Sequence, residues 1–200
     1  IFPGSNCDHD MVYLLKDIMK QEVVELWHKD TDLQGCDMII LPGGFSYGDY
    51  LRSGAIASLS PIMESVKKFA ADGGYVLGVC NGFQILCESG LLEGALLAND
   101  NQKFVCKNQY IATQTNSTAF TQKATIGKAL NIPIAHGEGR FFADEETIKR
   151  LNDNEQILFR YCDENGKISK KSNPNGSIEN IAGITNKTKN VFGMMPHPER

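Results

Sequence analysis

Apolar positions in the first ninety residues alternate between two spacings. Residues 8–21 carry apolar side chains three or four positions apart, as on one face of a helix, and residues 58–71 repeat this spacing. Two short continuous apolar runs, Met38–Leu41 and Tyr75–Val79, are typical of strands that are buried on both faces in a parallel sheet. Strand and helix therefore alternate, which predicts an α/β layered fold.

The remaining segments predict more strands than helices. Val23–Trp27 reads as a strand, and from Lys103 to Glu138 β-branched stretches replace the helical spacing. Ile157–Tyr161, Ile178–Ile184 and Val191–Met195 predict further strands. We expect the second half to be more antiparallel, within an open, layered, mostly parallel sheet flanked by helices.

Length and composition narrow the class of protein. With 200 residues, no internal repeat and no low-complexity linker, residues 1–200 are predicted to form one domain, trimmed at both ends because the chain opens inside an apparent strand. The formal net charge of −4 argues against a nucleic-acid partner. The chain shows neither a membrane-length apolar run nor a signal sequence, and its six cysteines form no CxxC pair. We therefore expect a cytoplasmic protein with free thiols.

The sharpest local signal is the pentapeptide at 78–82, GVCNG, between the strand Tyr75–Val79 and a helical pattern that ends near Gly90. It has the form of a nucleophile elbow, in which small neighbours let the chain turn sharply and expose the side chain of Cys80. The N-terminus of the following helix is expected to lower the pKa of the thiol. The same five residues also fit a buried structural cysteine between two turn glycines.

A cysteine nucleophile needs a base, and the sequence offers four histidines. His197 lies in the sequence PHPE after a predicted strand, where Pro198 holds it extended and Glu199 can orient its ring. PHPE also fits a rigid exposed turn. His136, in HGEGR, is a second possible partner of the cysteine but is more typical of a solvated loop residue. His9 and His28 are expected to be structural or exposed.

A second glycine-rich loop, residues 42–50, follows the strand Met38–Leu41. Its sequence PGGFSYGDY is neither GxGxxG nor a P-loop, so a nucleotide site is not expected. Its backbone N–H groups could instead supply an oxyanion donor, or the loop could be a plain glycine turn. No spacing of His, Cys, Asp or Glu resembles a metal site.

Five motifs taken together resemble a known family. In chain order they are PGSNCD from Pro3, LPGGFSYGDYLRSGAIA from Leu41, GVCNGFQIL from Gly78, NPNGS from Asn173 and GMMPHPER from Gly193. They are similar to the glutaminase subunits of phosphoribosylformylglycinamidine synthase, which are class I glutamine amidotransferases. The resemblance runs along the whole chain.

The resemblance implies a flavodoxin-like amidotransferase fold and a glutaminase that releases ammonia from L-glutamine. The ammonia goes to a PurL-type synthetase subunit, which uses ATP and Mg to make formylglycinamidine ribonucleotide in purine biosynthesis, and a small PurS-type protein bridges the two. No cofactor is implied for this chain itself. By motif, Cys80, His197 and Glu199 form the catalytic triad, and the backbone N–H groups of Gly44 and Asn81 form the oxyanion hole.

The same resemblance implies that Gln84, four residues after the nucleophile, contacts substrate glutamine and that the HGEGR loop lies near the site. Ser53 and Glu93 depart from the family pattern, away from the triad. Two other classes of function stay open. One is a different elbow-cysteine α/β enzyme, either another amidotransferase or a DJ-1-like hydrolase, although PHPE argues against the latter. The other is a binding subunit without catalysis.

Overall fold

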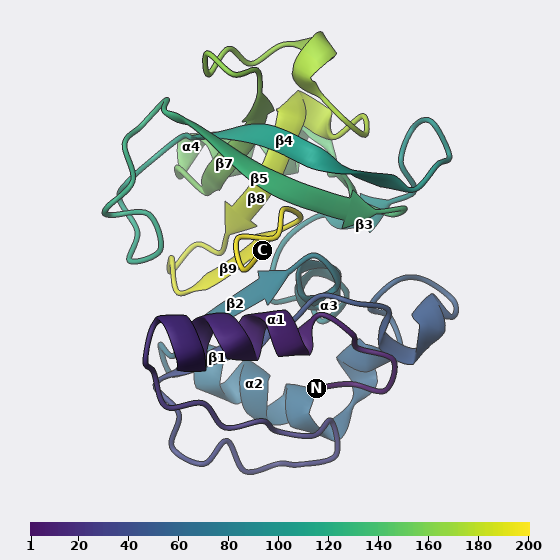
Figure 1. The fold of residues 1–200 in the computed structure, drawn as a ribbon, viewed down its shortest axis with the longest axis vertical. Helices are drawn as coiled ribbons and strands as arrows, with labels where there is room; N and C mark the ends of the chain where they lie inside the picture. Colours follow the sequence, from purple (N-terminus) through teal and green to yellow (C-terminus); the bar gives the residue numbers. More distant parts are fainter.

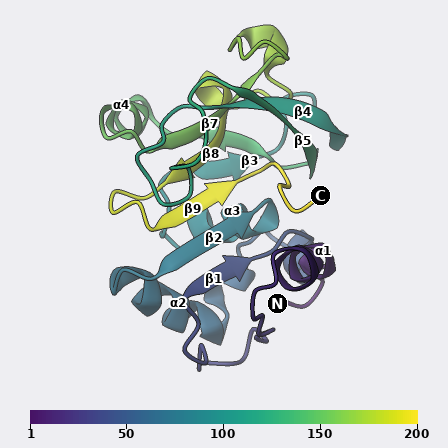
Figure 2. The ribbon, with the colours of Figure 1, turned by 60° about the vertical axis from the view of Figure 1, so that its left-hand side comes forward.

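The computed structural model describes all 200 residues, and its main feature is a curled seven-stranded sheet with helices on both sides (Figures 1 and 2). The α-helices are α1 (Asp8–Tyr13), α2 (Pro61–Ala71), α3 (Asn81–Glu88) and α4 (Glu145–Asp153). The strands are β1 (Met38–Leu41), β2 (Tyr75–Val79), β3 (Ala95–Leu97), β4 (Val105–Thr113), β5 (Ala129–His136), β6 (Arg140–Phe142), β7 (Ile157–Cys162), β8 (Ile181–Thr185) and β9 (Val191–Met194). A π-helical turn, Leu14–Ile18, extends α1, and the 3₁₀ turns are Ser46–Asp49, Ala57–Leu59, Lys170–Ser172 and Ile178–Asn180.

The strands of the sheet follow the order β1-β2-β9-β8-β7-β4-β5, and β3 pairs with β6 in a separate small sheet. Only β1, β2 and β9 run parallel to one another, while every pair from β9 to β5 is antiparallel. The expected α/β class and the more antiparallel second half are confirmed. The sheet as a whole is mixed rather than mostly parallel, because parallel neighbours need long crossovers and the chain after α3 supplies one more α-helix.

Helices cover the parallel end of the sheet. Figures 1 and 2 place α1 on one face and α2 on the other, and α3 packs against β1, β2 and β9. The α2 helix begins with Pro61, whose missing N–H costs nothing at the first helical position. The largest hydrophobic cluster fills the space between these helices and strands and contains Val79, Phe83 and Leu86, all fully buried. This packing fixes the start of α3 against the ends of the strands.

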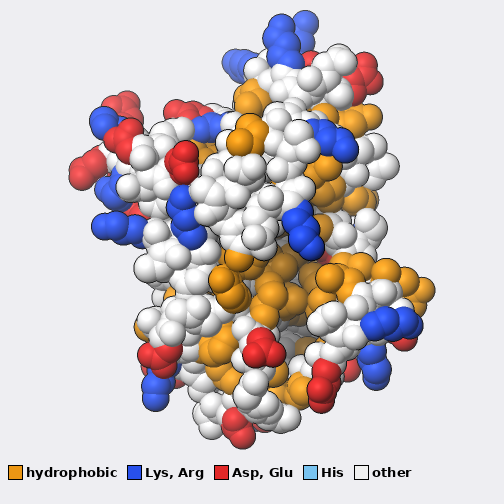
Figure 3. Space-filling model, turned by 90° about the vertical axis from the view of Figure 1, so that its left-hand side faces the viewer, with side chains coloured by type: hydrophobic (Ala, Val, Ile, Leu, Met, Phe, Trp, Pro, Cys, Tyr) orange, Lys and Arg blue, Asp and Glu red, His pale blue; other side chains and the backbone are white.

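Val23–Trp27 does not form the expected strand. The segment has no strand partner and is largely exposed, apart from Leu26, whose carbonyl accepts a hydrogen bond of 2.7 Å from the Ile1 amine. An apolar groove of about 400 Å³ separates it from β1 and α1. Figure 3 views one face of the molecule, on which hydrophobic side chains gather around a hollow. The strand propensity of these residues does not suffice to form a strand, because a strand also needs a hydrogen-bonding neighbour.

The contact between α3 and β1 depends on a glycine. A Cβ atom at Gly82 would overlap the carbonyl oxygen of Leu41, and the nearby backbone cannot move without shifting β1. We therefore expect Gly82→Ala to lower the free energy of unfolding by about 1 to 3 kcal/mol or more. Urea denaturation measures this loss. Gly137→Ala is the matched control, because its Cβ would meet nothing nearer than Phe104 at 3.8 Å; equal stability of the two variants would contradict the prediction.

Candidate active site

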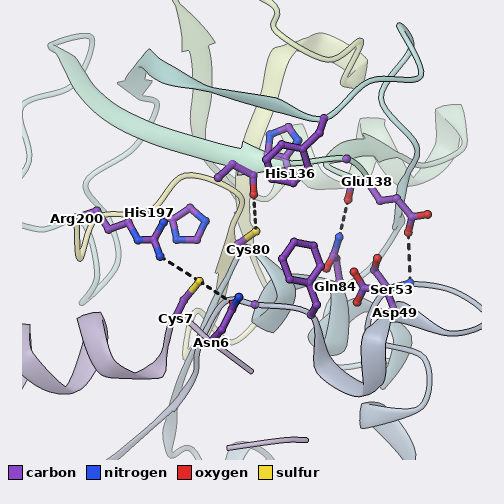
Figure 4. A pocket seen from close by; sticks show the side chains of 15 residues that line it. Asn6, Cys7, Asp49, Ser53, Cys80, Gln84, His136, Glu138, His197 and Arg200 are labelled. Carbon is purple, nitrogen blue, oxygen red and sulfur yellow. Dashed lines mark hydrogen bonds between the residues drawn. The ribbon is translucent and has the colours of Figure 1, made fainter. Parts of the chain in front are cut away.

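A pocket of about 280 Å³ opens at the carboxyl ends of the parallel strands. Leu41 of β1, Gly78 of β2 and Gly193 of β9 are in register, so the loops that follow these strands leave the sheet side by side. The end of β5 and the loop after it close the pocket from the other half of the sheet (Figure 4). The lining residues are Asn6, Cys7, Gly44, Phe45, Asp49, Ser53, Cys80, Gln84, Phe104, Ala135, His136, Gly137, Glu138, His197 and Arg200.

Cys80 occupies the sharp turn between β2 and α3. Its backbone has φ 50° and ψ −104°, a conformation that is strained for a residue with a side chain. The turn is possible because Gly78 and Gly82 pack directly on each other: a Cβ at Gly78 would lie 2.6 Å from the Gly82 carbonyl carbon. The nucleophile-elbow geometry predicted from GVCNG is therefore present. The expected exposure of the side chain is wrong, because Cys80 is only 5% exposed and its Sγ donates to the Ala135 carbonyl at 3.6 Å.

The expectation of a lowered thiol pKa is wrong for this state of the site. Burial raises the pKa of Cys80 well above its ordinary value, and the negative charges of Glu199 and Asp49 act in the same direction. The backbone N–H of Asn81, at the start of α3, opposes this rise but is the smaller effect. Cys80 is thus protonated at neutral pH in this state of the site.

His197 and Glu199 form a buried pair beside this cysteine. Nδ1 of His197 lies 2.7 Å from Oε1 of Glu199, and both side chains are shielded from solvent. The His197 N–H donates to the Pro133 carbonyl at 2.8 Å, which ties the carboxyl-terminal loop to β5. Nε2 of His197 has no hydrogen-bond partner. PHPE is therefore not an exposed turn, and the imidazole has a free nitrogen inside the cysteine pocket.

The three residues expected around substrate also gather here. Gly44 has φ 125°, and a Cβ there would lie 2.6 Å from the backbone nitrogen of Asn6. The Asn81 side chain accepts from the Ser46 N–H at 3.2 Å and donates to Gln84 Oε1 at 2.9 Å. Gln84 in turn donates to the Glu138 carbonyl at 2.6 Å. This network holds the glycine-rich loop, α3 and the loop after β5 in one arrangement.

His136 is not the solvated loop residue that its sequence suggested. It is 3% exposed, and its Nδ1 lies 3.1 Å from Oδ1 of Asn99. Burial lowers the pKa of His136 to about 4, and neighbouring His197 adds to this shift. The ring is therefore neutral near pH 7. His28 is buried against the Tyr47 hydroxyl at 2.7 Å, and His9 is exposed, as expected.

Several residues that line the pocket could not be assigned to the site from any single sequence motif. Arg200 donates to Asp10 at 2.7 Å and approaches the Cys7 sulfur at 3.3 Å. Asp49 and Glu138 lie on the other side of Cys80 (Figure 4). The signals were present in PGSNCD, HGEGR and PHPER, but only the fold brings these distant segments together.

Two further observations concern the whole chain. No group of three or more His, Cys, Asp or Glu side chains is arranged to hold a metal ion. None of the helices has both the length and the apolar character that crossing a membrane requires.

A strained cysteine elbow, a buried His-Glu pair and a mixed sheet together define a glutamine amidotransferase, and the full chain, residues 1–200, matches the family of CobB/CobQ-like glutamine amidotransferase domains. The chain is 56% identical over 200 residues to phosphoribosylformylglycinamidine synthase subunit PurQ of Koribacter versatilis, covering all of this chain and 87% of that protein. It is 55% identical over 199 residues to the PurQ subunit of Methanosarcina barkeri, covering 86% of that protein.

Among solved structures, a chain of the PurLQS structure from Thermotoga maritima has a TM-score of 0.88 and 43% identity, with 100% of this chain and 85% of that chain covered. A glutamine amidotransferase from the same organism, at 15% identity and a TM-score of 0.62 over 94% of this chain and 70% of its own, shares the fold. The chain belongs to the PurQ family of phosphoribosylformylglycinamidine synthase subunits.

The buried His136 gives a pH prediction. Because the unfolded chain binds a proton on this ring near pH 6.5 and the folded chain only near pH 4, stability is lost as the pH falls through this window. The loss is on the order of 3 kcal/mol. Measured by urea unfolding between pH 8 and pH 4, His136→Gln should show a flatter pH dependence than the original chain. If the free energy of unfolding changed equally with pH in the two proteins, this prediction would be contradicted.

Proposed function

We propose that this chain is the glutaminase subunit of a phosphoribosylformylglycinamidine synthase, which hydrolyses L-glutamine through a thioester on Cys80. The observation that carries the proposal is the strained elbow cysteine in one pocket with the buried His197-Glu199 pair. Membership of the PurQ family supports the substrate and the pathway. A binding subunit without catalysis would have no use for such strain.

In the first step, the Cys80 sulfur attacks the side-chain amide carbon of glutamine while Nε2 of His197 takes the thiol proton. Because burial raises the pKa of the thiol, we propose that proton transfer accompanies attack. Glu199 accepts the Nδ1 hydrogen bond, which fixes the tautomer and stabilises the imidazolium that forms. The backbone N–H groups of Gly44 and Asn81 are proposed to bind the oxyanion.

In the second step, the C–N bond breaks and His197 returns its proton to the departing nitrogen, which leaves as ammonia. Water then attacks the glutamyl thioester, and His197 accepts a proton from this water. Cleavage of the C–S bond releases glutamate, and the proton returns to the Cys80 sulfur. Every atom of this cycle comes from glutamine, water and the three side chains, so we propose that the chain needs no cofactor of its own.

The ammonia must reach a second protein. In water at neutral pH most of it would be protonated and unable to act as a nucleophile. We propose that it passes to a PurL-type synthetase, which uses ATP and Mg to form formylglycinamidine ribonucleotide, with a PurS-type bridging protein. The PurLQS structure from Thermotoga maritima, which contains a chain similar to this one, supports these partners. The six free cysteines support a reducing compartment, and we place the reaction in the cytoplasm.

Replacement of the nucleophile tests the proposal. In the assembled complex, Cys80→Ala should reduce glutamine hydrolysis on the order of 10⁴-fold or more, because it removes the sulfur that is proposed to form the thioester. Synthesis from added ammonium salt should continue, since the partner's reaction is untouched. The control is Cys106→Ala, which removes an exposed cysteine on β4 and should leave glutamine hydrolysis unchanged. Retained glutaminase turnover in folded Cys80→Ala would exclude the mechanism.

The loop at the pocket mouth predicts that hydrolysis depends on the partner. Residues 45–51 expose Phe45, Tyr50 and Leu51, and Tyr47 and Asp49 have positive φ values, so a partner can contact this strained loop directly. We expect the isolated chain to hydrolyse glutamine at least about tenfold more slowly than the complex, because docking on these exposed side chains adjusts the position of the oxyanion loop. Turnover is measured for the chain alone, then with synthetase, bridging protein, ATP and ribonucleotide. Equal rates in every mixture would contradict this dependence.

A further inference from the structure

A buried histidine that the mechanism does not use lies behind the glycine-rich loop. His28 is 7% exposed, and its Nδ1 lies 2.7 Å from the Tyr47 hydroxyl. Tyr47 belongs to the 3₁₀ turn Ser46–Asp49, three residues after Gly44, whose N–H is the proposed oxyanion donor. The tyrosine does not line the pocket, although Gly44 and Asp49 on either side of it do. Its side chain therefore ties the loop to the rest of the protein at a point outside the pocket.

The Tyr47 hydroxyl has a second partner at the start of α2. It lies 3.1 Å from Oγ of Ser60, the N-cap residue of that helix. A serine at this position ordinarily accepts a hydrogen bond from a backbone N–H of the first helical turn, but Ser60 forms no such bond. The His28 carbonyl accepts from the Ile62 N–H at 3.2 Å, so the histidine is fixed to the same end of the helix. The start of α2 thus provides a fixed support for the tyrosine hydroxyl.

The three side chains form one chain of hydrogen bonds with a defined direction. Burial lowers the pKa of His28, so its ring is neutral near pH 7 and carries one unprotonated nitrogen. With Nδ1 as that nitrogen, the Tyr47 hydroxyl donates to it, and the Ser60 hydroxyl donates to the Tyr47 oxygen. The rings of His28 and Tyr47 also pack edge to face, with centroids 5.6 Å apart. Hydrogen bonding and packing together fix where the tyrosine side chain lies.

Tyr47 needs this support because its backbone is strained. Its φ of 54° and ψ of 26° lie in the left-handed region, which a residue with a side chain rarely adopts. On the pocket side, the loop is held by the Ser46 N–H, which donates to Oδ1 of Asn81 at 3.2 Å. The loop is therefore fixed between α3 on one side and α2 on the other. Loss of the second attachment lets Tyr47 relax, which moves the backbone that leads back to Gly44.

We propose that Tyr47, held by His28 and Ser60, positions the glycine-rich loop so that the N–H of Gly44 is directed at the developing oxyanion. This assignment rests on the proposed glutaminase function. Tyr47 is a positioning residue, since it acts through the loop backbone from outside the pocket. An oxyanion donor acts on charge that develops in the transition state, so a displaced donor slows the chemical step and leaves the binding of glutamine unchanged.

Tyr47→Phe tests the assignment because it removes one hydroxyl and retains the ring. The matched control is Tyr13→Phe, which removes an exposed tyrosine hydroxyl on α1. The kcat and KM of glutamine hydrolysis are measured for the assembled complex with each variant. Alkylation of Cys80 by iodoacetamide is followed by mass spectrometry in the same samples. This displacement releases iodide and forms no oxyanion, so it reports the access to the thiol and its reactivity without the oxyanion donor.

We expect Tyr47→Phe to lower kcat by about tenfold, less than the roughly 10²- to 10³-fold cost of losing an oxyanion donor outright, because the bridge between Ser5 and Gly44 limits the displacement. KM, the iodoacetamide rate and the turnover of Tyr13→Phe should stay unchanged. An unchanged kcat would overturn the assignment. A rise in KM at constant kcat, or equal losses of turnover and alkylation, would overturn it as well.

Variants of His28 separate the hydroxyl contact from a general effect on folding. His28→Leu removes the acceptor of the Tyr47 hydroxyl, whereas His28→Asn can place an amide oxygen where Nδ1 lies. We expect His28→Leu to lower kcat as much as Tyr47→Phe, the double variant to lose no more, and His28→Asn to retain most of the turnover. Additive losses, or equal losses with Leu and Asn, would contradict the hydrogen-bond chain. If the original complex does not hydrolyse glutamine, or Cys80→Ala hydrolyses it at the original rate, the proposed function itself fails.

Discussion

The close approach of α3 to the ends of the parallel strands is the constraint on which the site depends. Gly78 of β2 packs directly on Gly82 in the first turn of α3, and Gly82 packs on Leu41 of β1. Because neither glycine has a side chain, the backbones come close enough for the chain to turn at Cys80. Any Cβ at these positions would overlap backbone atoms of Gly82 or Leu41 and so push α3 away from the strands. The same approach places Asn81 where its side chain can hold the glycine-rich loop at Ser46. Backbone packing thus comes first, and the polar network follows from it.

Much of this half of the molecule could be predicted from the sequence because its signals are local. Met38–Leu41 and Tyr75–Val79 are continuous apolar runs, and β1 and β2 have these same bounds. The elbow was also predicted from a local signal, because the small residues of GVCNG and its position after a strand can both be read from the sequence. PHPE likewise contained both members of the His197-Glu199 pair, two positions apart.

The rest depends on contacts between distant segments, which no local pattern contains. Val23–Trp27 has strand-forming residues but no neighbour, and the pairing of β4 with β5 and β7 is a property of the whole sheet. His136 and Glu138 belong to the site because β5 ends beside the elbow. The pKa of the Cys80 thiol is raised rather than lowered as expected, because it depends on contacts that the local sequence does not contain. A helix N-terminus can be anticipated from sequence, but the depth at which the thiol is buried cannot.

Burial also explains how the two histidines divide their roles. A positive charge can form on His197 because Glu199 lies against its Nδ1, whereas His136 has only the neutral amide of Asn99. A charged His136 would oppose the imidazolium of His197 across the same pocket, and its pKa near 4 prevents this at neutral pH. The site therefore permits one cationic ring at a time. In the proposed mechanism, the proton removed from Cys80 therefore stays on His197, which returns it to the departing nitrogen.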